Sequence, residues 1–213
     1  MTTATCFPTN TRSALVEFSL LESWLASSTA LQLPLHQIES QQQVKGREVQ
    51  RLLLQAHLQH RGNGDIGPAL QLEQVDGAAL YSHRRLSTRS LTTVFGTVEL
   101  VRMGYSRPSG PSIFPLDQAL ALPARSFSYE LQRRLVKAAV QNPFLESVQT
   151  IAELTGVSVS KRSLEEILPD AARDFDAFYQ QRSMAAAAGS ILVAAVDGMD
   201  RNSPARCQML RTG

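Results

Sequence analysis

Cysteine is almost missing from this chain of 213 residues, because Cys6 and Cys207 stand alone and form no CxxC pair. Isolated cysteines indicate neither a disulfide framework nor a zinc site, so we expect a reduced, cytoplasmic protein. Long apolar runs are missing too, since the most apolar stretch spans only residues 185–196 and contains Gly189 and Ser190. A bilayer requires about 20 apolar residues, and the first residues, MTTATCFPTNTR, lack the basic start and apolar stretch of a secretory signal. We therefore expect no membrane association.

The chain as a whole lacks a large excess of positive or negative charge. It carries 21 Lys and Arg against 19 Asp and Glu, so its net charge of +2 indicates no particular partner. The distribution is more informative. Between Ser82 and Arg107 there is a single acid, Glu99, and there are five arginines: Arg84, Arg85, Arg89, Arg102 and Arg107. A hydrophobic content of 43% is ample for a folded core.

Two amphipathic helices are predicted near the N-terminus, over residues 11–27 and about 35–60. The first has apolar residues at helical spacing, among them Leu15, Phe18 and Leu25. The stripe of the second consists of Ile38, Val49, Leu52, Leu53 and Ala56. The segment RGNGDIGPAL ends this helix, because glycine and proline interrupt helical structure. These stripes could be buried against neighbouring elements or against a second copy of the protein.

The segment RSLTTVFGTVELVRMGYSRP predicts two strands joined by a tight turn near Phe95-Gly96. We expect apolar contacts from Val94, Val98, Leu100 and Tyr105, whereas Arg89, Arg102 and Arg107 can point to water. A ribbon of this kind could follow a DNA backbone, since cations that contact phosphates release counterions. A solvated basic hairpin without a nucleic-acid partner is the alternative. An irregular, proline-rich connector, RPSGPSIFPLDQAL, follows it.

Helical structure is expected again from Phe127. We predict that Asn142 caps a second helix, which ends at Thr155-Gly156 with a left-handed residue. A third helix is expected to open near Ser158 or Ser160 and to end at Leu168, since Pro169 cannot continue it. Pro169 then begins a fourth helix with Phe175 and Phe178 on its inner face.

A helix, a short turn at Gly156 and a second short helix follow the plan of a helix-turn-helix. In that motif the first residues of the second helix face the bases. Those residues here are Ser158, Ser160, Lys161, Arg162 and Ser163. Lys161 and Arg162 would lie at the positive end of the helix dipole, a conflict that a DNA phosphate would relieve. Ordinary packing of the helix pair, without DNA, remains open.

An acid ends the most apolar segment of the chain, ILVAAVDGMD, where Asp197 follows an expected buried strand. A charge in such a place requires a partner or a metal, but Asp197-Gly198 is also a favourable turn dipeptide. His57 and His60 are spaced to share a metal on one helix. No third ligand accompanies them, so we expect solvated or capping histidines.

Several stretches together resemble the ISKra-type insertion-sequence transposases, from about Gly46 to Gly198. They are GREVQRLLLQAHLQHRGNGDIGPAL, TTVFGTVELVRMGYSRPSGPSIFPLDQALALP, TGVSVSKRSLEEI, ARDFDAFYQQR and ILVAAVDG. The resemblance implies a DNA-binding N-terminal half and an RNase-H-like catalytic domain. It also implies that Asp197 is the first of three acidic ligands for Mg²⁺ or Mn²⁺, the ions that activate in-line attack on phosphodiesters. Met199-Asp200 departs from the family's Lys-Gly, so we expect a truncated or frameshifted reading frame.

The expected fold is mainly α with a β-hairpin (α+β). It comprises a helical region (1–81), a basic hairpin (82–110), a helix-turn-helix-like DNA-binding bundle (111–182) and the start of a truncated RNase-H-like domain (183–213). We expect a homo-oligomeric fragment of a DDE-type transposase that binds double-stranded transposon-end DNA in the bacterial cytoplasm or nucleoid. It would cleave nothing alone, bind no small-molecule substrate and hold no metal of its own. A stand-alone DNA-binding regulator and a helical self-association module are the alternatives.

Overall fold

The computed structural model describes residues 9–74, 77–108 and 110–173, which belong to one compact unit of mixed helix and sheet. The α+β expectation is confirmed at this level. The expected strand at Ile191, the inward Phe175 and Phe178 and the RNase-H-like segment lie outside the described residues. Within the described ranges, no helix has both the length and the apolarity needed to cross a bilayer.

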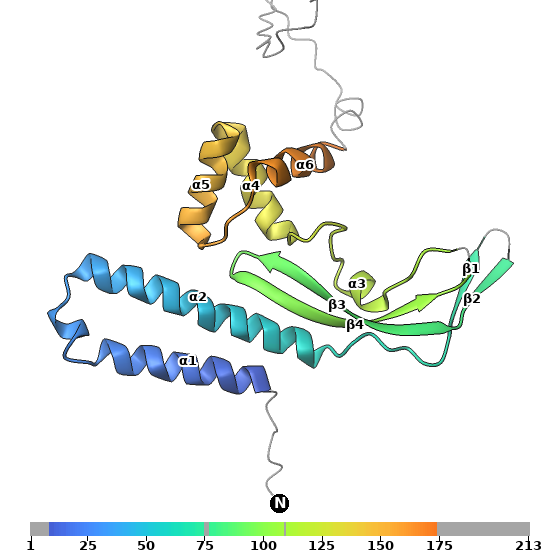
Figure 1. The fold of residues 1–213 in the computed structure, drawn as a ribbon, viewed down its shortest axis with the longest axis horizontal. Helices are drawn as coiled ribbons and strands as arrows, with labels where there is room; N and C mark the ends of the chain where they lie inside the picture. The colour runs from blue at the N-terminus through green and yellow to red at the C-terminus, as the bar shows by residue number, and fades with distance from the viewer. Residues whose placement is uncertain (1–8, 75–76, 109, 174–213) are drawn as a thin grey trace, which may run out of the picture. The chain divides into compact units, whose positions relative to one another are not determined.

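The N-terminal region is a pair of antiparallel helices, α1 (Thr9–Leu25) and α2 (Leu35–His60), with a short 3₁₀ turn between them (Figure 1). Ala14 and Leu21 are buried two turns apart on α1, which identifies the face that packs on α2. Leu15 and Phe18 are each 55% exposed. The predicted apolar stripe of the first helix is therefore not the face that α2 covers.

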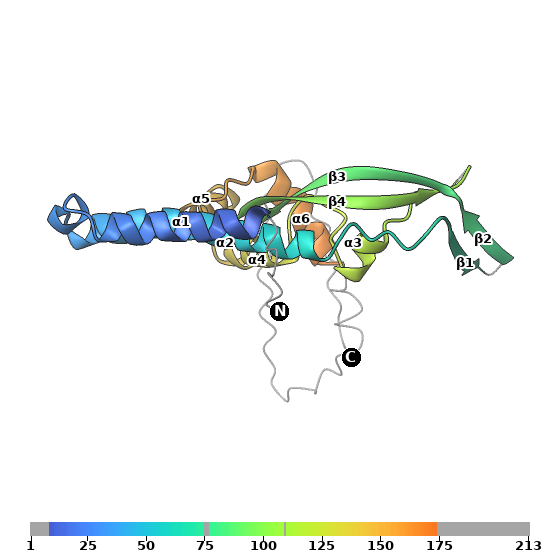
Figure 2. The same cartoon turned by 90° about the horizontal axis from the view of Figure 1, so that it is seen from below.

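Two antiparallel hairpins follow: β1 (Leu70–Gln74) with β2 (Gly77–Tyr81), and β3 (His83–Thr93) with β4 (Gly96–Ser106). The second was predicted, and its turn falls at Val94-Phe95, closed by Gly96 with a φ of 124°. The first hairpin corrects the expectation of a helical region over residues 1–81. Figures 1 and 2 both show β1–β2 at the end of the β3–β4 hairpin away from its turn.

The β3–β4 hairpin is buried on different faces at its two ends. Near the turn, Leu91, Val98 and Leu100 form a core with residues of α2 and with Leu116. At the other end, Met103 and Tyr105 project from the opposite face and pack against β1–β2. The expected apolar contacts are confirmed, because Val98, Leu100 and Tyr105 are buried and Val94 is partly buried against a further apolar cluster.

Gln55 fastens α2 to β4. Its side chain is buried, and its amide Nε2 donates to the Glu99 carbonyl oxygen at 2.7 Å, while its Oε1 accepts from the Glu99 N–H at 2.8 Å. The side-chain amide thus occupies the place that a neighbouring strand would take, and leaves neither backbone group unpaired.

A short helix, α3 (Pro115–Ala119), lies within the segment that was expected to be irregular. Its Asp117 pairs with the guanidinium groups of both Arg89 and Arg102, whose side chains are only 14% and 16% exposed. Arg89 also donates to the Arg125 carbonyl oxygen at 2.8 Å, and Arg102 lies 3.8 Å from the centroid of the Phe114 ring. The expectation that Arg89 and Arg102 point to water is wrong. Strand alternation places both on the face of Leu91 and Leu100, which α3 covers.

Three helices, α4 (Tyr129–Gln141), α5 (Phe144–Thr155) and α6 (Lys161–Ala171), enclose one apolar core. Its fully buried members are Leu131, Leu135, Leu164 and Ile167. Two details correct the expectations. Asn142 ends α4 rather than capping α5, because its amide donates to the Ala138 carbonyl oxygen at 3.2 Å. Pro169 lies inside α6, in the final turn, where its missing N–H removes a single helical hydrogen bond.

Replacing Asp117 with alanine would leave two largely buried guanidinium groups without their carboxylate. Because breaking a buried ion pair costs about 3–5 kcal/mol and this cluster keeps some exposure, we expect the free energy of unfolding to fall by about 3 kcal/mol. Urea denaturation measures it. Glu48→Ala, which removes a surface pair with Arg51, is the control and should cost less than about 1 kcal/mol. Equal losses in the two variants would contradict the interior role of Asp117.

Candidate nucleic-acid interface

The turn between α5 and α6 is tightly determined by its own residues. Gly156 adopts a φ of 68°, the left-handed conformation predicted from the sequence. Thr155 supplies a second constraint, since its hydroxyl donates to the Ile151 carbonyl oxygen at 2.6 Å and accepts from the Val157 N–H at 3.2 Å. Val157 and Val159 are buried while Ser158 is exposed. The α5–turn–α6 segment is therefore a fixed helix-turn-helix rather than two helices on a loose linker.

Packing also fixes the rotation of α6 about its axis. Leu164 and Ile167 are fully buried and mark the inner face of the helix. Residues on the other side of the helix therefore face outward. The outward-facing cations Lys161 and Arg162 have side chains that are 58% and 88% exposed. The expected start of the second helix is confirmed, because the Ser160 hydroxyl caps it by accepting from the Ser163 N–H at 3.0 Å.

The five residues predicted at the start of this helix therefore have different environments. Ser158, Lys161 and Arg162 are exposed, whereas Ser160 and Ser163 use their hydroxyls in the cap, with the two oxygens 2.8 Å apart. Lys161 and Arg162 are therefore the exposed cations at this end of α6.

Acids on α6 accompany these cations, a feature that the sequence analysis missed. Lys161 Nζ lies 3.5 Å from Glu165, and Arg162 Nε lies 3.3 Å from Glu166. A cation placed N-terminal to its acid is the less favourable order for the helix dipole. Such exposed pairs contribute little to stability, so a competing phosphate could displace them. The i to i+4 spacing in KRSLEE is the sequence signal that could have revealed the pairs.

A third cation, Arg125, reaches α6 from the connector that precedes α4. Arg125 pairs with Glu166 at 3.0 Å and with Asp170 at 2.6 Å. The hydrogen bond from Arg125 holds the pKa of the Asp170 carboxyl below its ordinary value, with a further contribution from Arg173. The acids Glu166 and Asp170 on this side of α6 are thus neutralised by arginines of the protein itself.

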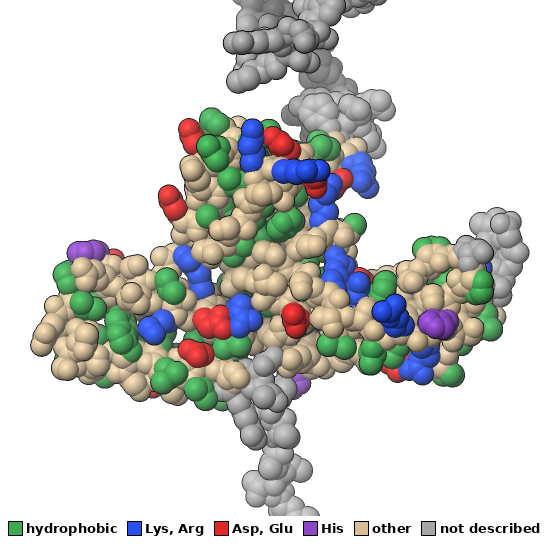
Figure 3. Space-filling model, viewed as in Figure 1, with side chains coloured by type: hydrophobic (Ala, Val, Ile, Leu, Met, Phe, Trp, Pro, Cys, Tyr) green, Lys and Arg blue, Asp and Glu red, His purple; other side chains and the backbone are tan. Residues whose placement is uncertain are grey.

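The arginines of the hairpin do not form one surface. Arg89 and Arg102 lie in the interior, Arg84 pairs with Asp65, and Arg107 stacks over the Tyr81 ring at 5.2 Å from its centroid. Arg85 is exposed and has no ion-pair partner among the residues that the structure describes. On the face shown in Figure 3, basic side chains are dispersed among acidic and uncharged ones. The expected basic ribbon is thus reduced to isolated charges.

A second set of cations lies on α4. Arg133 and Arg134 converge on Glu130, with N–O distances of 2.8 and 2.9 Å. Their hydrogen bonds lower the pKa of Glu130 to about 2. Arg47, near the middle of α2, donates to the Leu154 carbonyl oxygen at 3.1 Å, at the end of α5. This contact ties the helical hairpin to the helix-turn-helix and places a cation where the helix dipole favours one.

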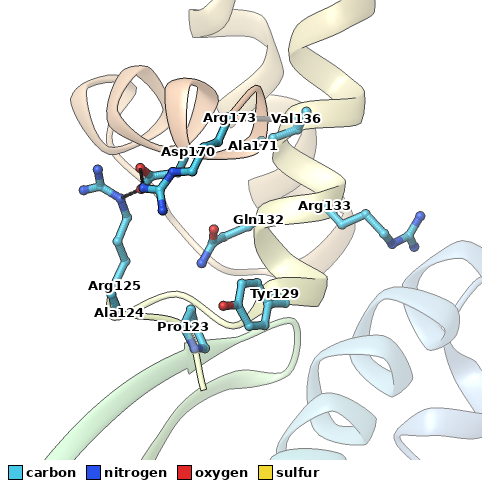
Figure 4. Close-up of a pocket in the computed structure, with 10 residues that line it drawn as sticks. All are labelled: Pro123, Ala124, Arg125, Tyr129, Gln132, Arg133, Val136, Asp170, Ala171 and Arg173. Carbon is cyan, nitrogen blue, oxygen red and sulfur yellow. Dashed lines mark hydrogen bonds and ion pairs between the residues drawn. The ribbon is translucent and has the colours of Figure 1, made fainter. Parts of the chain in front are cut away.

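Figure 4 shows a pocket of about 430 Å³ between the 123–125 connector, α4 and the end of α6. Tyr129 and Gln132 line it, Arg125 points to Asp170, and Arg133 points away from that pair. Arg125 and Arg173 share the Asp170 carboxylate, so the charges of the pocket are already paired. The described lining offers no nucleophile with an adjacent base, and we assign it no chemistry.

The candidate metal ligand Asp197 lies outside the described residues. Within the described part of the chain, no three His, Cys, Asp or Glu side chains are grouped as a metal site would require. This statement includes His57 and His60, which have no acidic companion there.

We expect Glu130 to titrate with a midpoint near pH 2, against an ordinary value of 4.5. Because its folded pKa is depressed, the stability it contributes is complete above pH 4.5 and is lost as pH falls toward 2. Carboxyl-resolved NMR titration measures the midpoint, and thermal unfolding of Glu130→Gln should lack this component of acid destabilisation. A midpoint at 4.5 would show that Arg133 and Arg134 do not hold the carboxylate.

Comparison with models of known protein families gives no match, and comparison with characterised proteins gives no significant one.

Proposed function

We propose that the described residues form the DNA-binding unit of a DDE-type transposase of the ISKra type, with α6 entering the major groove of double-stranded transposon-end DNA. One observation carries the proposal. The α5–Gly156–α6 segment is a rigid helix-turn-helix that exposes Lys161 and Arg162 at the first positions of its second helix.

The dimensions of α6 are consistent with this role. Its 11 residues span roughly 16 Å at 1.5 Å per residue, enough to lie across a major groove about 12 Å wide. Lys161 and Arg162 stand at the positive end of the dipole, where a phosphate would satisfy both the cations and the exposed helix N–H groups. Their present partners, Glu165 and Glu166, are surface acids that a phosphate can replace.

The catalytic part of the family's reaction is not assigned to these residues. Asp197 matches the family's first carboxylate and would hold Mg²⁺ or Mn²⁺ together with two further acids. The described residues contain no group of three such ligands, so we derive no cleavage step from them. We therefore assign to this part of the chain the recognition of DNA and no cleavage. The same role would suit a stand-alone regulator that occupies the transposon ends.

Replacing Lys161 and Arg162 with alanine should weaken binding to duplex DNA and flatten the dependence of log K on log salt by about one to two units, because up to two phosphate contacts are lost. Fluorescence anisotropy with labelled duplexes measures both. Lys45→Ala with Arg61→Ala, which removes the same charge from α2 and its end, is the control. Unchanged affinity and slope in the α6 variant would remove the helix-turn-helix from the proposal.

We also propose that α1 mediates self-association. Leu15, Val16, Phe18 and Leu20 are 55–56% exposed within two turns of one helix, and a monomer seldom leaves such apolar surface uncovered. A two-fold axis would place this face against its own copy, and of the acids on α1 Glu22 is exposed while Glu17 is half-buried. A dimer would present two helix-turn-helix motifs to two half-sites.

The full chain should accordingly sediment as a dimer, and Leu15→Gln, Phe18→Gln and Leu20→Gln together should render it monomeric without loss of helical circular dichroism. Val140→Gln with Leu145→Gln is the control, since both residues are exposed and apolar but belong to the helical bundle. A wild-type chain that stays monomeric at the highest attainable concentration would refute self-association and leave the DNA-binding proposal intact.

A further inference from the structure

We propose that Glu165 reads a base: its carboxylate accepts a hydrogen bond from the exocyclic amino group of a cytosine in the major groove. The unit would then prefer duplex DNA that carries cytosine at one fixed position. This inference rests on the proposed function, because it requires α6 to lie in the groove.

Glu165 lies on the outward face of α6, one helical turn after Lys161. The burial of Leu164 and Ile167 on the opposite side fixes that orientation. The Glu165 side chain is 46% exposed. Base contacts in a helix-turn-helix come from the N-terminal part of the second helix, and Glu165 is the fifth of its 11 residues.

The two neighbouring glutamates are held differently. Glu166 uses one carboxylate oxygen for Arg125 at 3.0 Å and the other for Arg162 at 3.3 Å. Glu165 has a single ion-pair partner among the described residues, Lys161, whose Nζ is 3.5 Å from Oε1. Its second oxygen, Oε2, takes part in no hydrogen bond or ion pair within the described ranges. Glu165 is therefore the carboxylate that can accept from a ligand, and Glu166 is the one that fixes α6 to the connector.

A carboxylate in a DNA groove is repelled by the phosphates, so its presence weakens binding unless it makes a favourable base contact. An ionised carboxylate can only accept hydrogen bonds. In the major groove, cytosine presents only the N4 amino donor. Adenine presents its N6 donor beside the N7 acceptor, and N7 would repel the second oxygen of a carboxylate that binds N6. A side chain that can only accept hydrogen bonds therefore matches the cytosine edge better than the adenine edge.

The test is selection of bound duplexes from a random library by the full chain, followed by sequencing. The wild type should enrich cytosine at one position. Glu165→Gln should lower that enrichment roughly tenfold and shift the preference toward adenine, because an amide can bond N6 and N7 together. It should also raise affinity for random duplex at low salt, since one repulsive charge is gone. Glu153→Gln, an exposed acid on α5, makes the same charge change and should leave the selected sequence unchanged.

The outcomes separate this inference from the proposal on which it rests. If Glu165→Gln selects the same cytosine with the same enrichment as the wild type, Glu165 is no base-reading residue, whereas the DNA-binding role stands. Wild-type binding without any cytosine preference has the same meaning. If the wild type retains no duplex even at low salt, both proposals fail.

Discussion

The carboxylate of Asp117 is the interaction on which the arrangement of this protein depends. It lies between the guanidinium groups of Arg89 and Arg102 under α3, and it makes two arginines part of the interior of the hairpin. Without it, the face that carries Leu91 and Leu100 could not be covered, because two unpaired cations would remain inside. Arg89 then also binds the carbonyl oxygen of Arg125, and Thr92 pairs with the backbone on either side of Phe127. The hairpin is thereby joined to the start of the helical bundle.

This constraint bears directly on function. Because four of the five hairpin arginines, all except Arg85, contact other groups of the protein, the cations best placed to meet DNA are those on the helices, above all at the start of α6. There two acids, Glu165 and Glu166, follow the two cations one helical turn later, so the proposed interface differs from a uniformly basic ribbon. Such a surface has a lower non-specific affinity for DNA, because its acids repel the phosphates. It also carries hydrogen-bond donors and acceptors that can distinguish base edges. Recognition by such a helix depends on a few fixed side chains more than on net charge.

Several features of the fold could be predicted because their causes lie within a few residues of one another. Gly156 ends α5 since glycine adopts the left-handed conformation at little cost, and Ser160 begins α6 through a hydrogen bond to a residue three positions on. The long helix from Leu35 to His60 was correct at both ends. The β1–β2 hairpin was missed, because LQLEQ and GAALY lack the β-branched residues that usually mark strands. The sequence around Pro169 predicts a helix end, whereas the final turn of α6 tolerates proline.

The sequence by itself therefore determined the helix-turn-helix and its exposed start, because capping, turn conformation and apolar periodicity are local properties of the chain. Only the tertiary structure decided which charges remain available. Asp117 lies 28 positions from Arg89, and Gln55 lies 44 positions from the Glu99 backbone that it binds. Pairs so distant in sequence meet only after strands and helices have packed, and no spacing of residues indicates them beforehand. The same reason explains why Glu166 is held by Arg125 while its neighbour Glu165 is not.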